Sequence, residues 1–218
     1  MNFEQARFNM IEQQLRPANV LDLDVLDVLF VVKREEFVPP AHRRLAFADT
    51  QIPLGGHDGA RMFAPMVEAH ALQALAMKTH ENVLEVGTGS GYMAALLGAH
   101  ADHVWSVEID PKMAATAREN LRRAGATNVS VEVGNGLAGL PAHAPYDAVM
   151  VSGAVAAVPQ ALLDQVKPGG RLFVVEGAAP AMEAVLYTRS DKGFSRRVVF
   201  ETVVAPLRDA VPAPAFVF

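Results

Sequence analysis

A run of alternating glycines in residues 82–92, NVLEVGTGSGY, has the residue types that can bind a small ligand. Val83, Leu84 and Val86 are typical of a short buried strand, and the pattern predicts that a helix begins near Tyr92. A strand, a glycine turn and the N-terminus of a helix together form a cradle for a small polar or anionic group. We therefore expect a ligand site at the end of this strand.

A second strand is expected at residues 103–107, and acidic side chains follow it at Glu108 and Asp110. These acidic residues lie about twenty residues beyond the glycines. In βαβ folds a carboxylate at this position can bind the ribose hydroxyls of a nucleotide. The two segments together predict a site for a nucleoside.

The glycine spacing and one acid narrow the choice of nucleoside. Gly87, Gly89 and Gly91 have G-x-G-x-G spacing, whereas a dinucleotide fingerprint has G-x-G-x-x-G, and Tyr92 stands where its third glycine would be. No Gly-Lys-Ser/Thr follows, so the loop is not a P-loop. Glu85 would repel a pyrophosphate but would suit an ammonium group. These features favour S-adenosylmethionine, which has an amino-acid end, a ribose and an adenine but no phosphate.

The elements that would position this site alternate between strand and helix. The alternation predicts βαβ units with right-handed crossovers and a parallel sheet. Residues 184–189 and 196–204 then alternate apolar and polar side chains around Asp191-Lys192-Gly193, which predicts an antiparallel hairpin. The expected strands are residues 83–86, 103–107, 129–133, 146–151 and 171–175, and the expected helices are residues 92–99, 111–124 and 159–166.

The first part of the chain is expected to be helical and then irregular. Helices are predicted at residues 3–16, where Arg16-Pro17 ends the segment, and at residues 22–32, where Asp22 can cap the N-terminus. Residues 49–63 are rich in glycine and predict an irregular loop that leads into a helix at residues 64–77. A loop of this kind often carries binding residues.

Composition excludes several classes of protein. The chain has 218 residues, 51% of them hydrophobic, and no cysteine, which excludes disulfides, thiolate metal sites and a cysteine nucleophile. Its formal net charge of −5 argues against a broad nucleic-acid surface. No apolar run reaches the length of a membrane span, and the N-terminus lacks the apolar core of a signal peptide. We expect a cytoplasmic protein that binds neither nucleic acid nor a membrane.

The remaining sequence features are few. The seven histidines show no metal-ligand spacing, so no metal is expected, and His57-Asp58 is the one pair with a possible functional role. A single domain is expected over residues 1–218. It would comprise N-terminal helices with an active-site loop (1–77), a cofactor-binding core (78–207) and an apolar tail (208–218).

Four stretches resemble class I S-adenosylmethionine-dependent methyltransferases. VLEVGTGSGY at residues 83–92 resembles their first motif, and VEID at residues 107–110 resembles their ribose-binding strand end. YDAVMV at residues 146–151 and VKPGGRLFVV at residues 166–175 resemble their later strands. Each match is weak by itself, whereas the four together are specific.

From about residue 6 to residue 207 the chain resembles the protein-L-isoaspartate O-methyltransferase family. NMIEQQLR, VKREEFVPP, LEVGTGSGY, the Gly-Asn-Gly at residues 134–136 and VVAPL at residues 203–207 carry the resemblance. It implies a Rossmann-like α/β fold: a seven-stranded, mostly parallel sheet with an antiparallel last strand, flanked by helices, plus an N-terminal helical extension. It also implies S-adenosylmethionine-dependent methylation of isoaspartyl carboxylates in damaged proteins, without specifying an oligomeric state.

The matched motifs imply which residues would bind the cofactor. Glu85 would lie near its ammonium group, Glu108 would bind both ribose hydroxyls, and Ile109 would pack on the adenine. Asn135 stands where the family usually has aspartate, and its carbonyl oxygen can still accept a hydrogen bond from the adenine amino group. The other implied cofactor residues are Gly87, Thr88, Gly89, Ser90, Gly91 and Gly136.

The chain departs from the family in the loop before the helix at residues 64–77. The family typically has T-I-S-x-P, whose Ser or Thr lies at the active site, whereas this chain has RMFAP at residues 61–65. The phenyl ring of Phe63 cannot donate a hydrogen bond to a substrate carboxylate. The segment SGAV at residues 152–155 also replaces the usual T-A-A-x.

These departures allow more than one interpretation. Either a nearby donor such as Arg61, His57 or Ser152 compensates and isoaspartyl proteins remain the substrates, or the chain methylates another acceptor. A third interpretation is a regulatory protein that binds the cofactor without turnover. Because a carboxylate is already nucleophilic, positioning supplies most of the rate, so the loss of one hydroxyl would weaken the activity about tenfold to a hundredfold without abolishing it.

Overall fold

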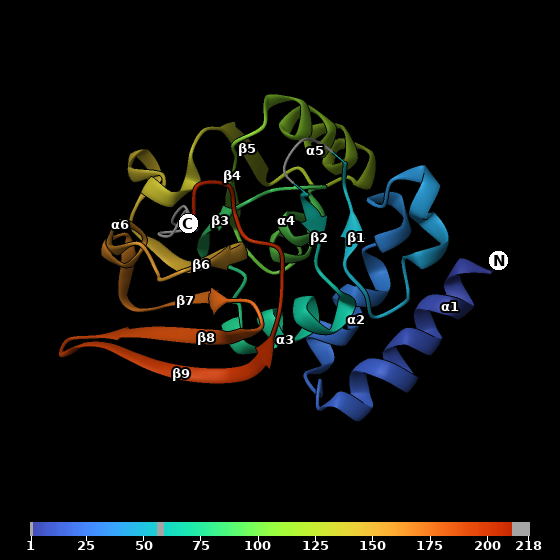
Figure 1. Cartoon of the computed structure of the whole chain (residues 1–218), viewed down its shortest axis with the longest axis horizontal. Coiled ribbons are helices and arrows are strands. Elements are labelled where there is room, and N and C mark those ends of the chain that lie inside the picture. Colours follow the sequence, from blue (N-terminus) through green and yellow to red (C-terminus); the bar gives the residue numbers. More distant parts are fainter. Residues whose placement is uncertain (1, 56–58, 211–218) are drawn as a thin grey trace, which may run out of the picture.

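A computed structural model describes residues 2–55 and 59–210, which are built around a seven-stranded sheet (Figure 1). The strand order is β5-β4-β3-β6-β7-β8-β9. Strands β3 to β7 pair in parallel, whereas β8 pairs antiparallel with both β7 and β9, which confirms the predicted sheet and its terminal hairpin. The strands are β3 (Asn82–Val86), β4 (His103–Glu108), β5 (Val129–Val133), β6 (Tyr146–Val155), β7 (Val166–Ala178), β8 (Ala181–Ser190) and β9 (Gly193–Thr202).

The helices agree with the prediction except near the N-terminus and at residues 159–166, where the helix is shorter than expected. The helix expected over residues 3–16 ends at Met10 and continues as a π turn, Ile11–Leu15. The helix expected from Asp22 is confirmed, because the Asp22 side chain accepts hydrogen bonds from the backbone N–H groups of Asp24 and Val25. The helices are α1 (Phe3–Met10), α2 (Leu23–Val31), α3 (Pro65–Leu75), α4 (Tyr92–Gly98), α5 (Pro111–Ala124) and α6 (Gln160–Asp164).

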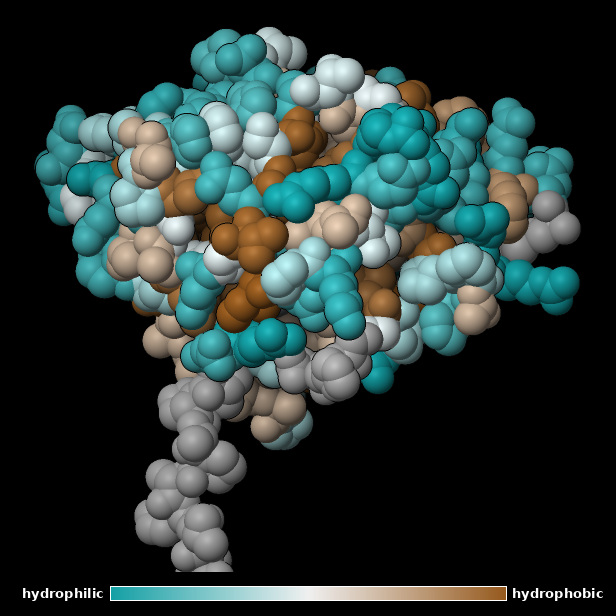
Figure 2. Space-filling view, turned by 90° about the horizontal axis from the view of Figure 1, so that it is seen from above, coloured by the Kyte–Doolittle hydropathy of each residue, from teal (hydrophilic) through white to brown (hydrophobic). Residues whose placement is uncertain are grey.

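Hydrophobic packing covers both faces of the sheet. One cluster joins strand residues such as Val83 and Met150 to α3, α4, α5 and the N-terminal helices. A second cluster joins the alternate strand residues, such as Leu84 and Val149, to Leu162 of α6. Because successive side chains of a strand point to opposite faces, a strand that is covered on both sides is apolar throughout. Figure 2 shows one outer face, where apolar side chains are exposed between hydrophilic ones.

Several sequence-based boundaries are wrong. The strand expected at residues 146–151 continues to Val155, and the irregular loop expected at residues 49–63 contains two short strands, Ile52–Pro53 and Arg61–Met62. The turn expected at residues 166–170 lies inside β7, which begins at Val166 and pairs with Tyr146 of β6 before the next pair, Ala148 and Arg171. The pairing register shifts between these two pairs, so the extra residues of β7 are accommodated as an irregularity in a continuing strand. For the same reason α6 ends at Asp164, before the position expected from the sequence.

Two smaller elements complete the surroundings of the glycine loop. Strands β1 (Ile52–Pro53) and β2 (Arg61–Met62) form an antiparallel ribbon. Residues 203–208, here called the strap, follow β9 and return from the edge of the sheet to its middle (Figure 1). There the Ala154 N–H donates to the Ala205 carbonyl at 2.9 Å, and the Leu207 N–H donates to the Ala154 carbonyl at 2.9 Å.

Two segments with sequence-based expectations lie outside the described residues. His57-Asp58 and residues 211–218 of the apolar tail lie outside the described ranges. Within residues 2–55 and 59–210, every helix is too short or too polar to cross a bilayer. In the same ranges His, Asp and Glu side chains do not gather in a group that could hold a metal ion.

Candidate active site

The glycine loop follows β3 and leads directly into α4. Gly87, Gly89 and Gly91 have φ angles of 92°, 54° and 86°, which side-chain-bearing residues rarely adopt. Gly87 also has no room for a side chain, because a Cβ there would lie 2.8 Å from Leu207 Cδ2 and 3.4 Å from the Ser152 carbonyl oxygen. The loop is therefore a tightly packed turn that presents its backbone to the space beside it.

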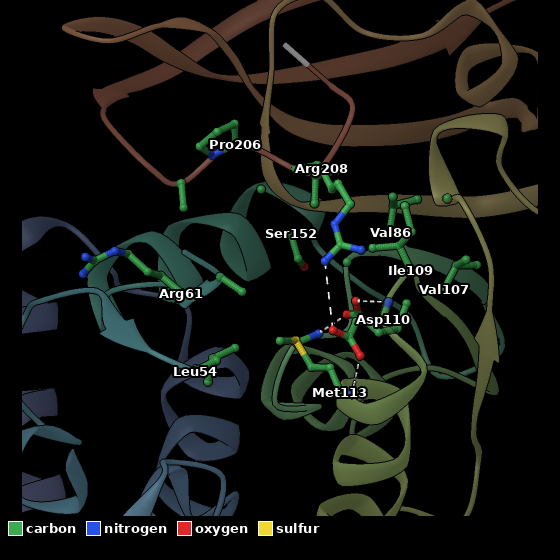
Figure 3. Close-up of a pocket in the computed structure, with 18 of the residues that line it drawn as sticks. Leu54, Arg61, Val86, Val107, Ile109, Asp110, Met113, Ser152, Pro206 and Arg208 are labelled. Carbon is green, nitrogen blue, oxygen red and sulfur yellow. Dashed lines mark hydrogen bonds and ion pairs between the residues drawn. The ribbon is translucent and has the colours of Figure 1, made fainter. Parts of the chain in front are cut away.

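A cleft lies beside this loop, at the carboxyl ends of β3, β4 and β6 (Figure 3). This edge of a parallel sheet is where ligands bind in open α/β folds. The empty space of the cleft, including the part open to solvent, is about 820 Å³. The strap contributes to its lining, and so does the β1–β2 ribbon through Arg61. The predicted cofactor residues that line it are Gly87, Gly89, Glu108, Ile109, Asn135 and Gly136.

Glu108 ends β4 with its carboxylate held at the cleft. One of its oxygens, Oε2, accepts the Gly89 N–H at 2.8 Å, and Oε1 accepts the Asp110 N–H at 3.0 Å. The side chain is 5% exposed, so its position is fixed by these bonds and by packing. Each carboxylate oxygen can accept a further hydrogen bond. Both oxygens of Glu108 thus have acceptor capacity left at the cleft, and the binding of ribose hydroxyls by this residue stays a prediction.

Beyond Glu108 the cleft has an apolar end. Ile109, Met113 and Leu137 line it there and can enclose a flat ring. The Asn135 side chain caps the 3₁₀ turn Gly136–Ala138, because its Oδ1 accepts the Leu137 N–H at 3.0 Å. This is the oxygen that was expected to bind the adenine amino group. Its second lone pair can still accept a hydrogen bond from that group.

Glu85 lies deeper, in a recess that opens from the cleft beside Gly87 and Gly89. It is fully buried, and its two oxygens accept hydrogen bonds from Ser152 Oγ at 2.9 Å and from Ser106 Oγ at 2.6 Å. Burial raises the pKa of the Glu85 carboxyl to about 8, against the lowering effect of the two hydroxyls. No Lys, Arg or His of the described chain forms an ion pair with it. Thr88 and Ser90 line the same recess.

A buried ion pair lies next to the recess, and one of its members, Glu68, lines it. Arg34, which is 0% exposed, donates from Nη1 to Glu68 Oε2, from Nη2 to the Phe63 carbonyl at 2.6 Å and from Nε to the Ala46 carbonyl at 2.8 Å. Its guanidinium carbon lies 5.1 Å from the centre of the Tyr92 ring. Glu68 lines the recess with Phe63 and Tyr92, and burial raises its pKa to about 7 although Arg34 opposes this shift.

The three residues predicted to take part in catalysis have different places. Phe63 is buried, lines the recess with its apolar neighbours Met62 and Met93, and belongs to the hydrophobic core. Ser152 lines both spaces, and its hydroxyl is donated to Glu85. Arg61 also lines both spaces, but it is exposed and Figure 3 shows its guanidinium directed away from the cleft.

Sequence reasoning missed Arg34 and Glu68. Glu68 has a signal that could have identified it, since it lies four and seven residues before Leu72 and Leu75 and therefore on the apolar side of its helix. An ionisable group on that side is buried and needs a partner. Arg34 had no comparable signal, because it lies in a charged turn whose residues resemble a solvated surface.

These features fit S-adenosylmethionine. A buried carboxyl that lacks a cationic partner suits the ammonium group, a two-oxygen acceptor suits the ribose and an apolar end suits the adenine. A model of the protein-L-isoaspartate(D-aspartate) O-methyltransferase family matches residues 5–211. The chain belongs to this family. It is accordingly an S-adenosylmethionine-dependent O-methyltransferase, and the resemblance noted in the sequence is confirmed.

Relatives with the same description extend over most of the chain. Protein-L-isoaspartate O-methyltransferase 1 of Syntrophobacter fumaroxidans is 39% identical over 193 residues, which are 88% of this chain and 89% of that protein. The protein-L-isoaspartate O-methyltransferase of Methanoculleus marisnigri is 42% identical over 179 residues, which are 82% of this chain and 80% of that protein.

Solved structures share the fold. A protein-L-isoaspartate O-methyltransferase has a TM-score of 0.80 and 26% identity over 92% of this chain and 65% of that one, so this chain spans just under two thirds of its length. A candidate enzyme of the same name from Plasmodium falciparum, in complex with S-adenosyl-L-homocysteine, has a TM-score of 0.79 and 18% identity over 95% of this chain and 99% of that one.

Proposed function

We propose that this chain transfers a methyl group from S-adenosylmethionine to the free carboxylate of an isoaspartyl residue in a protein or peptide. Membership of the protein-L-isoaspartate O-methyltransferase family supports the acceptor. The single structural observation that carries the cofactor assignment is Glu85, a fully buried carboxyl at the end of β3 that has two hydroxyl partners and, among the described residues, no cationic one.

The cofactor would occupy the cleft with its amino-acid end in the recess. Glu85 would bind the ammonium group, the backbone of the glycine loop would follow the methionine chain, and Glu108 would accept both ribose hydroxyls. Ile109 would pack on the adenine, next to Asn135. Thr88 would support Glu85 through its hydrogen bond with Ser106, at 2.5 Å between the two hydroxyl oxygens. When bound, the cofactor supplies a methyl group on a positively charged sulfur.

The protein has little acid–base work to do in this reaction. A carboxylate acceptor has no proton to remove, so rate comes from holding it in line with the methyl group and from excluding water. Phe63, Met62 and Met93 give the recess an apolar wall that excludes water. Arg61 lines both the cleft and the recess, and a rotamer turned toward the cleft would bring its positive charge to the acceptor carboxylate.

A filter assay with labelled S-adenosylmethionine tests the proposal. The acceptors are a peptide with one isoaspartyl residue and a twin peptide with an ordinary aspartyl residue. Transfer of label to the first peptide and not to the second is the expected result. Equal transfer to both peptides, or transfer only to proteins that lack isoaspartyl residues, would refute it.

A different methyl acceptor is the second candidate, and Phe63 is the observation that favours it. The recess has two acidic side chains, Glu68 and Glu85, and a phenyl ring where the family has a hydroxyl donor. Such a lining disfavours an anionic acceptor unless Arg61 turns inward. Methyl transfer to a protein extract in which isoaspartyl residues have been removed beforehand would support this candidate.

A further inference from the structure

The strap has two separate sets of contacts with the rest of the protein. In its second half Leu207 is bound by Ala154 of β6, and its side chain packs so closely on the glycine loop that a Cβ at Gly87 would lie 2.8 Å from Leu207 Cδ2. In its first half Val204 is buried in the hydrophobic core, and the side chain of Gln51, from the N-terminal part of the chain, binds the backbone on either side of it. Gln51 Nε2 donates to the Val203 carbonyl at 2.8 Å, and Gln51 Oε1 accepts the Ala205 N–H at 3.1 Å.

Gln51 joins the strap to the part of the chain that carries the predicted acceptor residues. It directly precedes β1, whose Ile52 pairs with Met62 of β2. Arg61 begins β2 and Phe63 directly follows it, so Gln51 and these residues lie in or next to the strands of one ribbon. The bonds of Gln51 therefore connect this ribbon directly to the strap, in addition to the packing of Val204. Both line the cleft, through Arg61 on one side and Ala205 and Pro206 on the other.

Ala205 is the residue at which three parts of the chain meet. Its N–H is bound by Gln51, and its carbonyl accepts the Ala154 N–H at 2.9 Å. Without the Gln51 side chain, the Ala205 N–H and the Val203 carbonyl lose their partners, while the contacts of Leu207 with Ala154 and Gly87 remain. The consequence is confined to the first half of the strap, away from the glycine loop.

We propose that Gln51 is a positioning residue for the methyl acceptor, which holds the first half of the strap at a fixed distance from the β1–β2 ribbon. The acceptor enters between these two segments, and the cofactor site lies beyond them. The inference rests on the proposed function for the identity of the acceptor, but the tie between Gln51 and the strap is independent of it.

The test compares Gln51→Ala and Gln51→Glu with a matched control, Gln73→Ala. Gln73 on α3 makes the same kind of bonds to backbone far from the cleft: it accepts the N–H groups of Leu21 at 2.8 Å and Asp22 at 3.1 Å, and donates to the Asn19 carbonyl at 3.0 Å. The Gln51→Glu variant keeps the oxygen that accepts the Ala205 N–H but has no N–H for the Val203 carbonyl.

Gln51→Ala should raise the KM for the isoaspartyl peptide about tenfold, the effect of one or two lost hydrogen bonds, while the Kd of S-adenosylhomocysteine changes less than about twofold. Gln51→Glu should lie between Gln51→Ala and the unaltered protein. The Gln73→Ala variant should keep both constants and show a lower Tm. Amide hydrogen exchange should become faster at Ala205 in Gln51→Ala, and should be unchanged at Leu207.

Three results would overturn the proposal: unchanged exchange at Ala205, faster exchange there with unchanged kinetics, or an equal loss of affinity for peptide and S-adenosylhomocysteine. The experiment also separates the two proposals of function. If the unaltered protein transfers no methyl group to the isoaspartyl peptide, the proposed acceptor is wrong. The hydrogen-exchange measurement still tests whether Gln51 holds the strap. The kinetics of the Gln51 variants are then compared by labelling of a total protein extract.

Discussion

Two glutamates at the ends of neighbouring strands have different environments, which suit different groups of a ligand. Glu85 is fully buried, its partners within residues 2–55 and 59–210 are two hydroxyls, and burial raises its pKa. Glu108 is bound by two backbone N–H groups at the wall of the cleft. The first can gain a negative charge when a cation arrives, whereas the second is already arranged to accept hydroxyl groups. This difference suits a ligand with an ammonium group at one end and a ribose further along.

Glu85→Gln should weaken binding of S-adenosylhomocysteine about tenfold to a hundredfold at pH 8, the effect of losing one charged hydrogen bond. In the unaltered protein the pKa of Glu85 is about 8, so below that pH the carboxyl must lose a proton before it can bind the ammonium group. Affinity should therefore fall about tenfold for each pH unit between pH 8 and pH 6. Calorimetry at several pH values measures both effects, and an equal slope in the variant would contradict this role.

Phe63→Ser should raise kcat/KM for the isoaspartyl peptide about tenfold to a hundredfold if the missing hydroxyl limits the rate. Phe63→Ala is the matched control, because it removes the same buried ring without adding a donor. Both variants should lose stability by about 3 to 5 kcal/mol, as expected for a large-to-small change in a core. The measurement is kcat/KM of both variants, at a temperature where both are folded. Equal rates for the two variants would show that the recess has been rebuilt beyond this residue.

At the scale of the elements, the site depends on how closely its loops pack on the strand ends. The 3₁₀ turn Gly136–Ala138 lies against β3 and β4: a Cβ at Gly136 would be 2.5 Å from Val86 Cγ1 and 3.4 Å from Val107 Cβ. Both valines also line the cleft. The position of this turn therefore sets the shape of the apolar end of the cleft.

Gly136→Ala should destabilise the protein by about 1 to 3 kcal/mol, because overpacking against Val86 displaces the turn. It should also weaken S-adenosylhomocysteine binding. Gly134→Ala is the control in the same loop, since a Cβ there would meet only Val107 Cγ1 at 3.8 Å, an ordinary contact. Urea unfolding and calorimetry measure the two quantities. Equal effects of the two substitutions would show that close packing at Gly136 is not the cause.

At the scale of the whole molecule, the N-terminal part and the strap complete a site whose base is the central sheet. Arg34 from the N-terminal part holds the Phe63 carbonyl and Glu68, and Gln51 holds the strap. Each contact joins segments that are far apart in sequence. The burial of Glu68 and Glu85 follows from this closure, and it raises the pKa of both carboxyls.

The ligand-free protein should become less stable as the pH rises from 5.5 to 8.5. The folded-state pKa values of Glu68 and Glu85, about 7 and about 8, lie above the value of 4.5 for an ordinary glutamate. Their contribution to stability is complete at low pH and is lost as the pH rises through these values, by on the order of 1 kcal/mol per group and pH unit. Urea unfolding at each pH measures the trend, and Glu85→Gln should reduce it. A flat or rising profile would contradict the assignment.

The parts of the fold and of the site that could be predicted depend on residues that are adjacent in the sequence. The sheet and its hairpin were predictable because strands covered on both faces are apolar throughout and because βαβ units alternate regularly. Glu85, Glu108 and the glycines were predictable because a strand end, a turn and a helix start are adjacent in the chain. The boundary of β7 was not, since Pro168 and Gly169 are typical of a turn and only pairing with β6 keeps the strand continuous.

The sequence by itself determined the family, the sheet and the acidic residues at the strand ends, because each can be inferred from successive short segments without knowing how those segments pack together. The tertiary structure decided the environment of Phe63. It showed that Arg34 binds both the Phe63 carbonyl and Glu68. It also showed that Ser152 donates a hydrogen bond to Glu85 and that Arg61 points away from the cleft. It also revealed the contact between Gln51 and the strap, which are 152 residues apart in sequence at Val203. Such contacts depend on how distant segments pack together, which no local pattern of residues records.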